Sequence, residues 1–169
     1  GGTIKKTPLV AFGRPTRAGI RAIRLKENER LVGVEVCEEG QDIILATHNG
    51  MSIRFPESDL RPMGRDAHGV RGIRLRKGDH VVDLVVASPG VSILTACENG
   101  YGKRTALDQY RRQTRGGYGV INIRTSERNG PVVAVKAVQE EDDVMMITSA
   151  GMIVRTPVNT ISQISRNTV

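Results

Sequence analysis

The sequence predicts an all-β fold built from a repeated unit of about 50 residues. One anchor of the repeat begins at a glycine and returns at residues 2–8, 50–56, 100–106 and 151–157. A second anchor keeps the same register at residues 19–24, 69–74 and 119–124. Turn signals separate the stretches between anchors, and no stretch shows convincing helical periodicity. These observations predict a propeller-like wheel of four-stranded blades, of which the chain holds about three and a half.

Each unit resolves into short strands with turns between them. A β-branched strand is expected at residues 31–36, 81–87 and 132–138, and the next strand at residues 42–47, 92–97 and 143–148. That second strand runs into Asn49-Gly50 or Asn99-Gly100, the signal for a type I′ hairpin, and the strand after it carries Ile53 and Phe55. The unit boundaries predicted from the anchors are 1–49, 50–99, 100–150 and a partial unit at 151–169.

The fourth strand of each unit is expected at residues 20–25, 70–75 and 120–125. Because neighbouring strand residues point to opposite faces, Ile23, Ile73 and Ile123 are expected to face inward. The arginine after each isoleucine then faces solvent or joins two blades. A sandwich of unrelated strands is the alternative fold, but it gives no reason for the period.

Composition excludes several classes of protein. With 169 residues, 38% of them hydrophobic and 25% charged, the chain suits one globular domain and is too apolar for disorder. No apolar run approaches the length of a membrane helix, and the opening at Gly1 does not read as a targeting signal, so we expect a piece of a longer cytoplasmic protein. Cys37 and Cys97 stand without a Cys-x-x-Cys pair, which argues against a disulfide framework and a zinc site.

The charge follows the repeat. The formal net charge is +7, and most of the 25 cations are arginine, whose planar fork of donors suits phosphate. Residues 5–26, 54–77 and 103–124 are net basic, whereas residues 27–42, 78–98 and 127–143 are net acidic. Equivalent segments occupy equivalent places in a wheel, so the basic halves are expected on one rim as a track for a polyanion. A mixed solvated surface would instead intersperse the signs within each unit.

Duplex DNA is the expected partner. Aromatic residues make up only 3% of the chain, which is too few for a platform that stacks single-stranded bases. Charge and shape hold a duplex backbone without reading its sequence, and a curved basic track favours a bent duplex.

The residues carry no sign of catalysis, a cofactor or a metal. His48, His68 and His80 occupy different repeat positions without partners at ligand spacing, and we interpret them as surface or turn residues. No serine lies in a nucleophile elbow, and no phosphate-loop motif is present. The chain by itself is therefore not expected to be an enzyme.

The most distinctive segment is residues 109–119, where Arg111, Arg112 and Arg115 crowd a glycine-rich turn. Glycine lets backbone amides approach a phosphate closely, while the arginines supply charge. A flexible basic loop is the alternative, and Gly119 shares its repeat position with Gly19 and Gly69, which indicates a partly structural role.

Residues 49–59, 61–65, 69–75, 98–104, 116–123 and 126–130 together resemble the C-terminal domain of DNA gyrase A, part of a bacterial type II topoisomerase. The resemblance covers essentially the whole chain. It implies a β-pinwheel, a propeller variant in which neighbouring blades exchange a strand and DNA wraps around a basic rim to support ATP-dependent negative supercoiling. It also implies the rest of gyrase A, as a dimer, and gyrase B as partners, and a cytoplasmic, nucleoid-associated location.

Residues 113–119 resemble the heptad Gln-Arg-Arg-Gly-Gly-Lys-Gly of that family, with Thr114 and Tyr118 in place of arginine and lysine. We interpret them as a later-blade echo of a heptad that lies upstream. The family's catalytic tyrosine belongs to another region, so Tyr101, Tyr110 and Tyr118 have no implied catalytic role. The alternatives are the similar domain of topoisomerase IV and a propeller-like scaffold for an acidic protein.

The expected DNA contacts fall after the hairpins, in the loops before the second anchor, and in the glycine-rich turn. They are Lys5, Lys6, Arg14, Arg17, Arg54, Arg65, Lys103, Arg104, Arg111, Arg112, Arg115, Gly116, Gly117, Tyr118, Gly119, Arg155 and Arg166.

Overall fold

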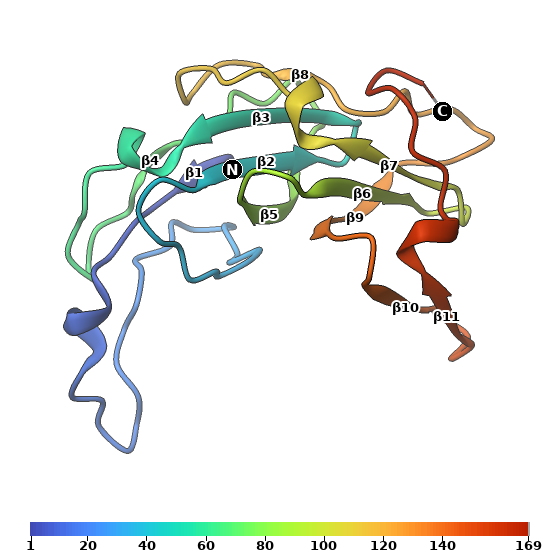
Figure 1. The fold of residues 1–169 in the computed structure, drawn as a ribbon. Helices are drawn as coiled ribbons and strands as arrows, with labels where there is room; N and C mark the ends of the chain where they lie inside the picture. The colour runs from blue at the N-terminus through green and yellow to red at the C-terminus, as the bar shows by residue number, and fades with distance from the viewer. Residues whose placement is uncertain (169) are drawn as a thin grey trace.

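The computed structural model describes residues 1–168 as a curved row of antiparallel sheets (Figure 1). The largest sheet has the order β5-β2-β3-β8, and its neighbour has the order β7-β6-β9. Two further sheets pair β1 with β4 and β10 with β11. The strands are β1 (Thr3–Ile4), β2 (Asp42–Thr47), β3 (Met51–Pro56), β4 (Val70–Arg71), β5 (Val81–Ala87), β6 (Ser92–Cys97), β7 (Gly102–Ala106), β8 (Val120–Ile121), β9 (Val132–Val138), β10 (Asp143–Ile147) and β11 (Ile153–Pro157).

A short 3-10 turn follows β1 and the second strand of each of the hairpins β2–β3, β6–β7 and β10–β11. These turns are η1 (Leu9–Phe12), η2 (Glu57–Asp59), η3 (Leu107–Gln109) and η4 (Val158–Thr160). In the last three, the first residue is buried, and this residue anchors the chain where it leaves the sheet.

The hairpins form where the sequence predicts them, but the predicted turn type is wrong. The amide of Gly50 donates to the carbonyl of Thr47 at 3.0 Å, and the amide of Gly100 donates to that of Cys97 at 3.1 Å. A type I′ turn needs positive φ at both central residues. Gly50 and Gly100 have φ of 81° and 83°, whereas neither preceding asparagine has positive φ. Each turn therefore fits a three-residue loop closed by a glycine bulge.

We call the side where β5 and β9 lie together the hub, and the opposite edge of the large sheet, where β8 lies, the rim. Strand β5 pairs with β2, and β9 pairs with β6, each with a register shift near the end. The two strands β5 and β9 lie side by side, because Asp83 of β5 accepts the amide of Val135 at 3.0 Å. The opposite edge of the large sheet is β8, which comes from the following unit and pairs with β3. Neighbouring units thus share a sheet, as the wheel with exchanged strands requires.

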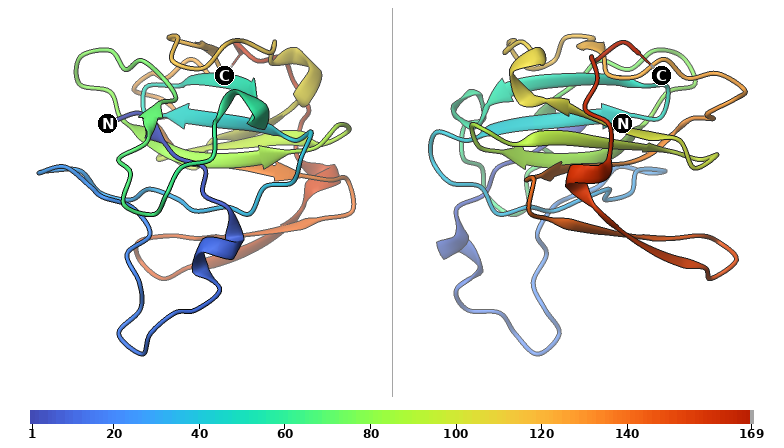
Figure 2. Two further views of the ribbon diagram at one scale, coloured as in Figure 1. Left: turned by 90° about the vertical axis from the view of Figure 1, so that its left-hand side faces the viewer. Right: turned by 45° about the vertical axis from the view of Figure 1, so that its right-hand side comes forward.

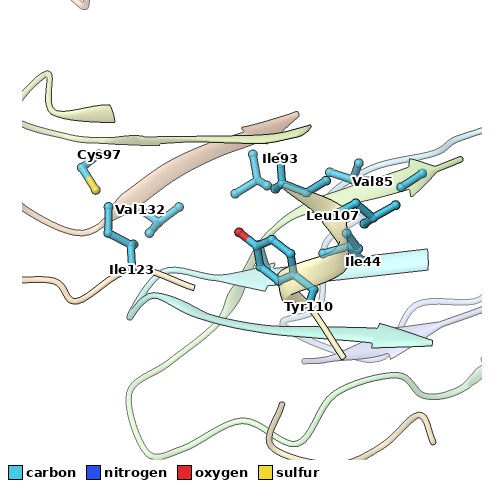
Figure 3. Close-up of a cluster of buried hydrophobic side chains, with 11 residues drawn as sticks. Ile44, Val85, Ile93, Cys97, Leu107, Tyr110, Ile123 and Val132 are labelled. Carbon is cyan, nitrogen blue, oxygen red and sulfur yellow. The ribbon is translucent and has the colours of Figure 1, made fainter. Parts of the chain in front are cut away.

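Apolar side chains fill the space between the sheets (Figure 3). Ile44, Val85, Ile93 and Val132 come from β2, β5, β6 and β9, and none is more than 4% exposed. Tyr110 joins them at 1% exposure, and its hydroxyl donates to Oδ1 of Asn122 at 2.6 Å. Burial raises the pKa of Tyr110 to about 12. A second apolar cluster around Ile53 and Phe55 lies on the amino-terminal side of this core.

The strands expected at residues 20–25 and 31–36 do not form, and those at 70–75 and 120–125 shrink to two residues each. Residues 13–40 instead form an extended excursion beside the sheets (Figure 2). Residues 31–36 pair with no strand among the described residues 1–168. With no strand to pair with in this chain, their backbone groups stay outside a ladder, despite high β propensity.

Candidate nucleic-acid interface

One cation of the repeat, which follows a hairpin turn in three of its four copies, pairs with an acid. Four such pairs recur along the chain: Lys6 with Glu57, Arg54 with Asp42, Arg104 with Glu140, and Arg155 with Asp143. The Lys6 ammonium lowers the pKa of the Glu57 carboxyl through a hydrogen bond. Arg54 also donates to the carbonyls of Leu107 and Tyr110, at 2.7 and 2.9 Å. This recurring cation therefore joins each hairpin to its surroundings.

Lys103 is buried, which contradicts its expected contact with phosphate. It is 1% exposed, and its ammonium donates to the carbonyls of Ser165, Arg166 and Thr168 at 2.8, 2.5 and 2.9 Å. Burial, followed by the charge of Arg166, lowers the pKa of Lys103 to about 8. Lys5 has the same role in its own unit, where it donates to the carbonyls of Ala22, Gly64 and Arg65.

Arg54 and Arg104 are likewise held inside, so their expected phosphate contacts are contradicted as well. The Arg104 side chain is 8% exposed and that of Arg54 is 14% exposed. The sequence could not predict their carbonyl partners, because every residue has a backbone carbonyl and the residue type does not show which one accepts.

The loop arginines Arg65, Arg115 and Arg166 connect one unit to another. Each donates to a carbonyl on the preceding outer segment, those of Arg21, Arg71 and Ile121 respectively. Arg115 also donates to the carbonyl of Asp59 at 3.1 Å. All three are half-buried, so part of each guanidinium is already occupied by protein.

The glycine-rich turn packs against the protein, with its first amide already bonded. The amide of Gly116 donates to the carbonyl of Gly72 at 2.6 Å, and the carbonyl of Gly117 accepts the amide of Arg74 at 2.7 Å. A Cβ at Gly119 would overlap the carbonyl of Ser52. Close packing between segments explains these glycines, and the amide of Gly116 is not free for phosphate, contrary to expectation. Tyr118 projects outward and is 47% exposed.

The remaining expected contacts are exposed. Arg111 and Arg112 lie on the surface after η3, and Arg112 also pairs with Asp42 at 2.9 Å. Arg14 and Arg17 lie on the excursion after η1, and Lys6 and Arg155 keep partial or full exposure beside their acids.

The structure also exposes cations that the expected set omits. We call residues 20–26, 70–76 and 120–126 the rim segments, because the second and third contain the outer strands β4 and β8. Among residues 1–168, no carboxylate lies within 4.0 Å of five exposed rim arginines, namely Arg24, Arg71, Arg74, Arg76 and Arg124. The buried Ile73 and Ile123, at 1% and 2% exposure, face inward as predicted. That alternation was the signal for the exposed arginines beside them.

Other kinds of site find little support in the described residues. No group of three or more His, Cys, Asp or Glu side chains in residues 1–168 could hold a metal ion. None of the helices described there has the length and apolar character needed to cross a membrane. An open hollow of about 350 Å³ lies between η3 and the end of β9, with Asp108, Glu140 and Gln163 on its wall.

Comparisons with known proteins agree with this fold. The family described as "DNA gyrase C-terminal domain, beta-propeller" matches residues 1–38, 41–88, 92–139 and 142–169. The DNA gyrase A protein of Streptococcus pyogenes serotype M3 is 57% identical over 168 residues, which cover 99% of this chain and 20% of that protein. The chain thus spans about a fifth of the length of this curated relative.

Two solved structures have the same fold. The C-terminal domain of DNA topoisomerase IV superposes with a TM-score of 0.92 at 27% identity, covering 99% of this chain and 53% of that one. The DNA gyrase A C-terminal domain superposes with a TM-score of 0.90 at 25% identity, covering 99% and 56%. The two folds are thus about equally close, and the family assignment depends on the sequence. The four family matches and the 57% identity place this chain in the DNA gyrase C-terminal domain family of β-propellers.

Proposed function

We propose that the chain binds duplex DNA without base-sequence preference, through the exposed cations of its rim segments. The observation that carries this proposal is the set of rim arginines without acidic partners, of which Arg71, Arg74 and Arg76 lie on or just after β4. Guanidinium groups in this state can exchange bound water and counter-ions for phosphate oxygens. Arg111, Arg112 and Tyr118 extend the same surface, and Arg14, Arg17, Lys6, Arg65, Arg115, Arg155 and Arg166 are secondary candidates.

The rim is the site, and the hub is not. At the hub, the cation Lys136 of β9 is already paired with Asp83 of β5 at 3.3 Å. A duplex that follows the rim segments of successive units must bend, at a cost on the order of 1 to 6 kcal/mol for 20 to 30 base pairs. Each further unit that is engaged offsets part of that cost. We therefore infer that the domain wraps DNA as a non-catalytic part of gyrase A, working with the rest of gyrase A in a dimer and with gyrase B in the bacterial cytoplasm.

Salt dependence of binding tests which cations face the DNA. Arg74→Gln combined with Arg124→Gln should lower the slope of log affinity against log salt by about two units, since each lost phosphate contact contributes about one. The matched control is Lys136→Gln combined with Arg30→Gln, which removes the same charge from a hub strand and from the exposed part of the net acidic stretch 27–42. The control should change the slope by less than about half a unit. Equal changes in both would refute the assignment to the rim.

Duplexes of graded length test wrapping separately from binding. Affinity at fixed salt should increase until the duplex spans the rim segments and then level off. If short duplexes bound as tightly as long ones, binding would occur without a curved path.

A further inference from the structure

Tyr118 lies where two arginines from another unit meet its ring. The guanidinium carbon of Arg74 is 5.3 Å from the ring centroid, and that of Arg76 is 6.0 Å from it. Both distances are within the range of cation–π attraction. The ring itself remains 47% exposed, so the cluster forms at the surface.

The backbone fixes this arrangement. The amide of Gly116 donates to the carbonyl of Gly72, and the amide of Arg74 donates to the carbonyl of Gly117, at 2.6 and 2.7 Å. The segment that carries the ring and the segment that carries the arginines are therefore bonded on both sides of the contact. Their register cannot slip without breaking both hydrogen bonds, so the ring stays beside the two arginines.

The guanidinium groups at this junction are available to an anion. In residues 1–168, neither Arg74 nor Arg76 has a carboxylate within 4.0 Å. A guanidinium that stacks on a ring uses its flat face, and its five N–H donors, which lie in its plane, stay free. The ring can therefore hold both groups while their edges point to phosphate oxygens.

The preceding junction lacks this arrangement, although its backbone is similar. There the amide of Arg24 faces the carbonyl of Ala67 at 3.5 Å, as Arg74 faces Gly117. The repeat places His68 at the position of Tyr118 and Lys26 at that of Arg76. No cation–π contact involves those two residues, within the described part of the chain. Of these two junctions, only the one at Tyr118 brings two arginines to an aromatic ring.

We propose that Tyr118 is a positioning residue that holds Arg74 and Arg76 as a two-pronged clamp for neighbouring phosphates on one strand of a duplex. This inference depends on the proposed function, and it adds that the junction at Tyr118 is the strongest phosphate contact on the rim. Without the ring, both long side chains keep their charge but lose their fixed position. The cost appears in affinity, although the net charge of the protein does not change.

Substitutions at Tyr118 test the clamp with a duplex of about 30 base pairs at fixed salt. Tyr118→Leu should weaken binding by about fivefold to tenfold, whereas Tyr118→Phe, which keeps the ring, should stay within about twofold of the unchanged chain. The matched control is Tyr101→Leu. It removes another ring in cation–π contact, whose centroid lies 5.0 Å from the guanidinium carbon of Arg128 at a hairpin turn. It should also stay within about twofold.

A combined variant distinguishes positioning from a direct role of the ring. When Arg74→Gln and Arg76→Gln are already present, adding Tyr118→Leu should cause almost no further loss. If Tyr118→Leu binds like the unchanged chain, or if Tyr118→Phe is as weak as Tyr118→Leu, the clamp is refuted. Greater loss for single-stranded than for duplex DNA would also refute it, because the ring would then stack on bases. If the two arginine substitutions alone leave affinity unchanged, the rim proposal itself fails.

Discussion

Asp42 offers a sharp test of what holds neighbouring units together. It begins β2, is 3% exposed, and its Oδ2 accepts Nε of Arg54 at 2.6 Å and Nε of Arg112 at 3.1 Å. Arg112 comes from the loop after η3, so one carboxylate links the β2–β3 hairpin to the unit that follows it. Asp42→Asn would leave the Arg54 guanidinium, whose side chain is 14% exposed, without a counter-ion. Removing one partner of a buried pair costs about 3 to 5 kcal/mol, and we expect that loss in the free energy of unfolding.

Asp143 provides the matched control, because it holds the same place in the β10–β11 hairpin. Its partner Arg155 has a side chain 71% exposed, and the Asp143 side chain is 33% exposed. An exposed pair contributes about 0 to 1 kcal/mol, so Asp143→Asn should cost little. Equilibrium unfolding in urea measures both losses on the same chain. Equal losses would refute the argument that burial decides the strength of this repeated pair.

The chain itself suggests a compensating variant. At the position of Asp42 in the next unit stands Ser92, whose hydroxyl meets the Gln163 side-chain amide oxygen at 3.3 Å, and Gln163 occupies the place of Arg112. Asp42→Ser combined with Arg112→Gln should therefore be more stable than Asp42→Ser alone, by about 1 kcal/mol. If the double variant were the less stable of the two, Arg112 would be contributing through contacts other than its ion pair.

Three further outcomes follow from the geometry. Gly119→Ala should lower the free energy of unfolding by more than about 3 kcal/mol, because φ is 74° and the new Cβ meets the Ser52 carbonyl. Gly100→Ala should lower it by only about 1 to 2 kcal/mol, because φ is 83° but the Cβ enters open space. Thermal unfolding measures both losses. Burial lowers the pKa of Lys103 from 10.5 to about 8, so between these pH values the unfolded chain binds more protons than the folded one. The free energy of unfolding should therefore increase with pH in that range, and Lys103→Met should remove the increase. Burial raises the pKa of Tyr110 from 10.0 to about 12, so the free energy of unfolding should decrease as pH rises through that range. In urea unfolding curves recorded at a series of pH values, Tyr110→Phe should make this decrease smaller.

The central strands could be predicted from sequence, residue for residue. Strands β2, β5, β6 and β9 begin and end where the β-branched runs do, because turn residues bound those runs on both sides. Residues 31–36 also carry alternate valines, at Val32, Val34 and Val36, and form no strand. A strand needs a neighbour for its backbone groups, and residue types do not report whether one is present.

The candidate site was harder to predict, since charge alone does not separate a surface cation from a buried one. Arg104 and Arg111 look alike in sequence, yet the first is enclosed by the carbonyl of Ile161 and Glu140, and the second lies in solvent. The partner acids and carbonyl groups lie tens of residues away along the chain. Alternation with Ile73 and Ile123 allowed Arg74 and Arg124 to face solvent or to join two blades, and it did not place them among the expected DNA contacts.

The exchange of β8 onto β3 affects how such a gene can change in length. Within the described residues, β3 takes its outer strand β8 from the following unit, and β1 pairs in the same way with β4 of the unit after it. A tandem duplication inside the array creates a copy whose outer strand pairs with the preceding unit and whose own sheet accepts the outer strand of the next unit. Both strand pairings that the copy needs are therefore already present in the array. A single unit moved into an unrelated gene would leave one sheet without its outer strand and one outer strand without a sheet. Inheritance of this architecture therefore favours gain or loss within an array over transfer of isolated units.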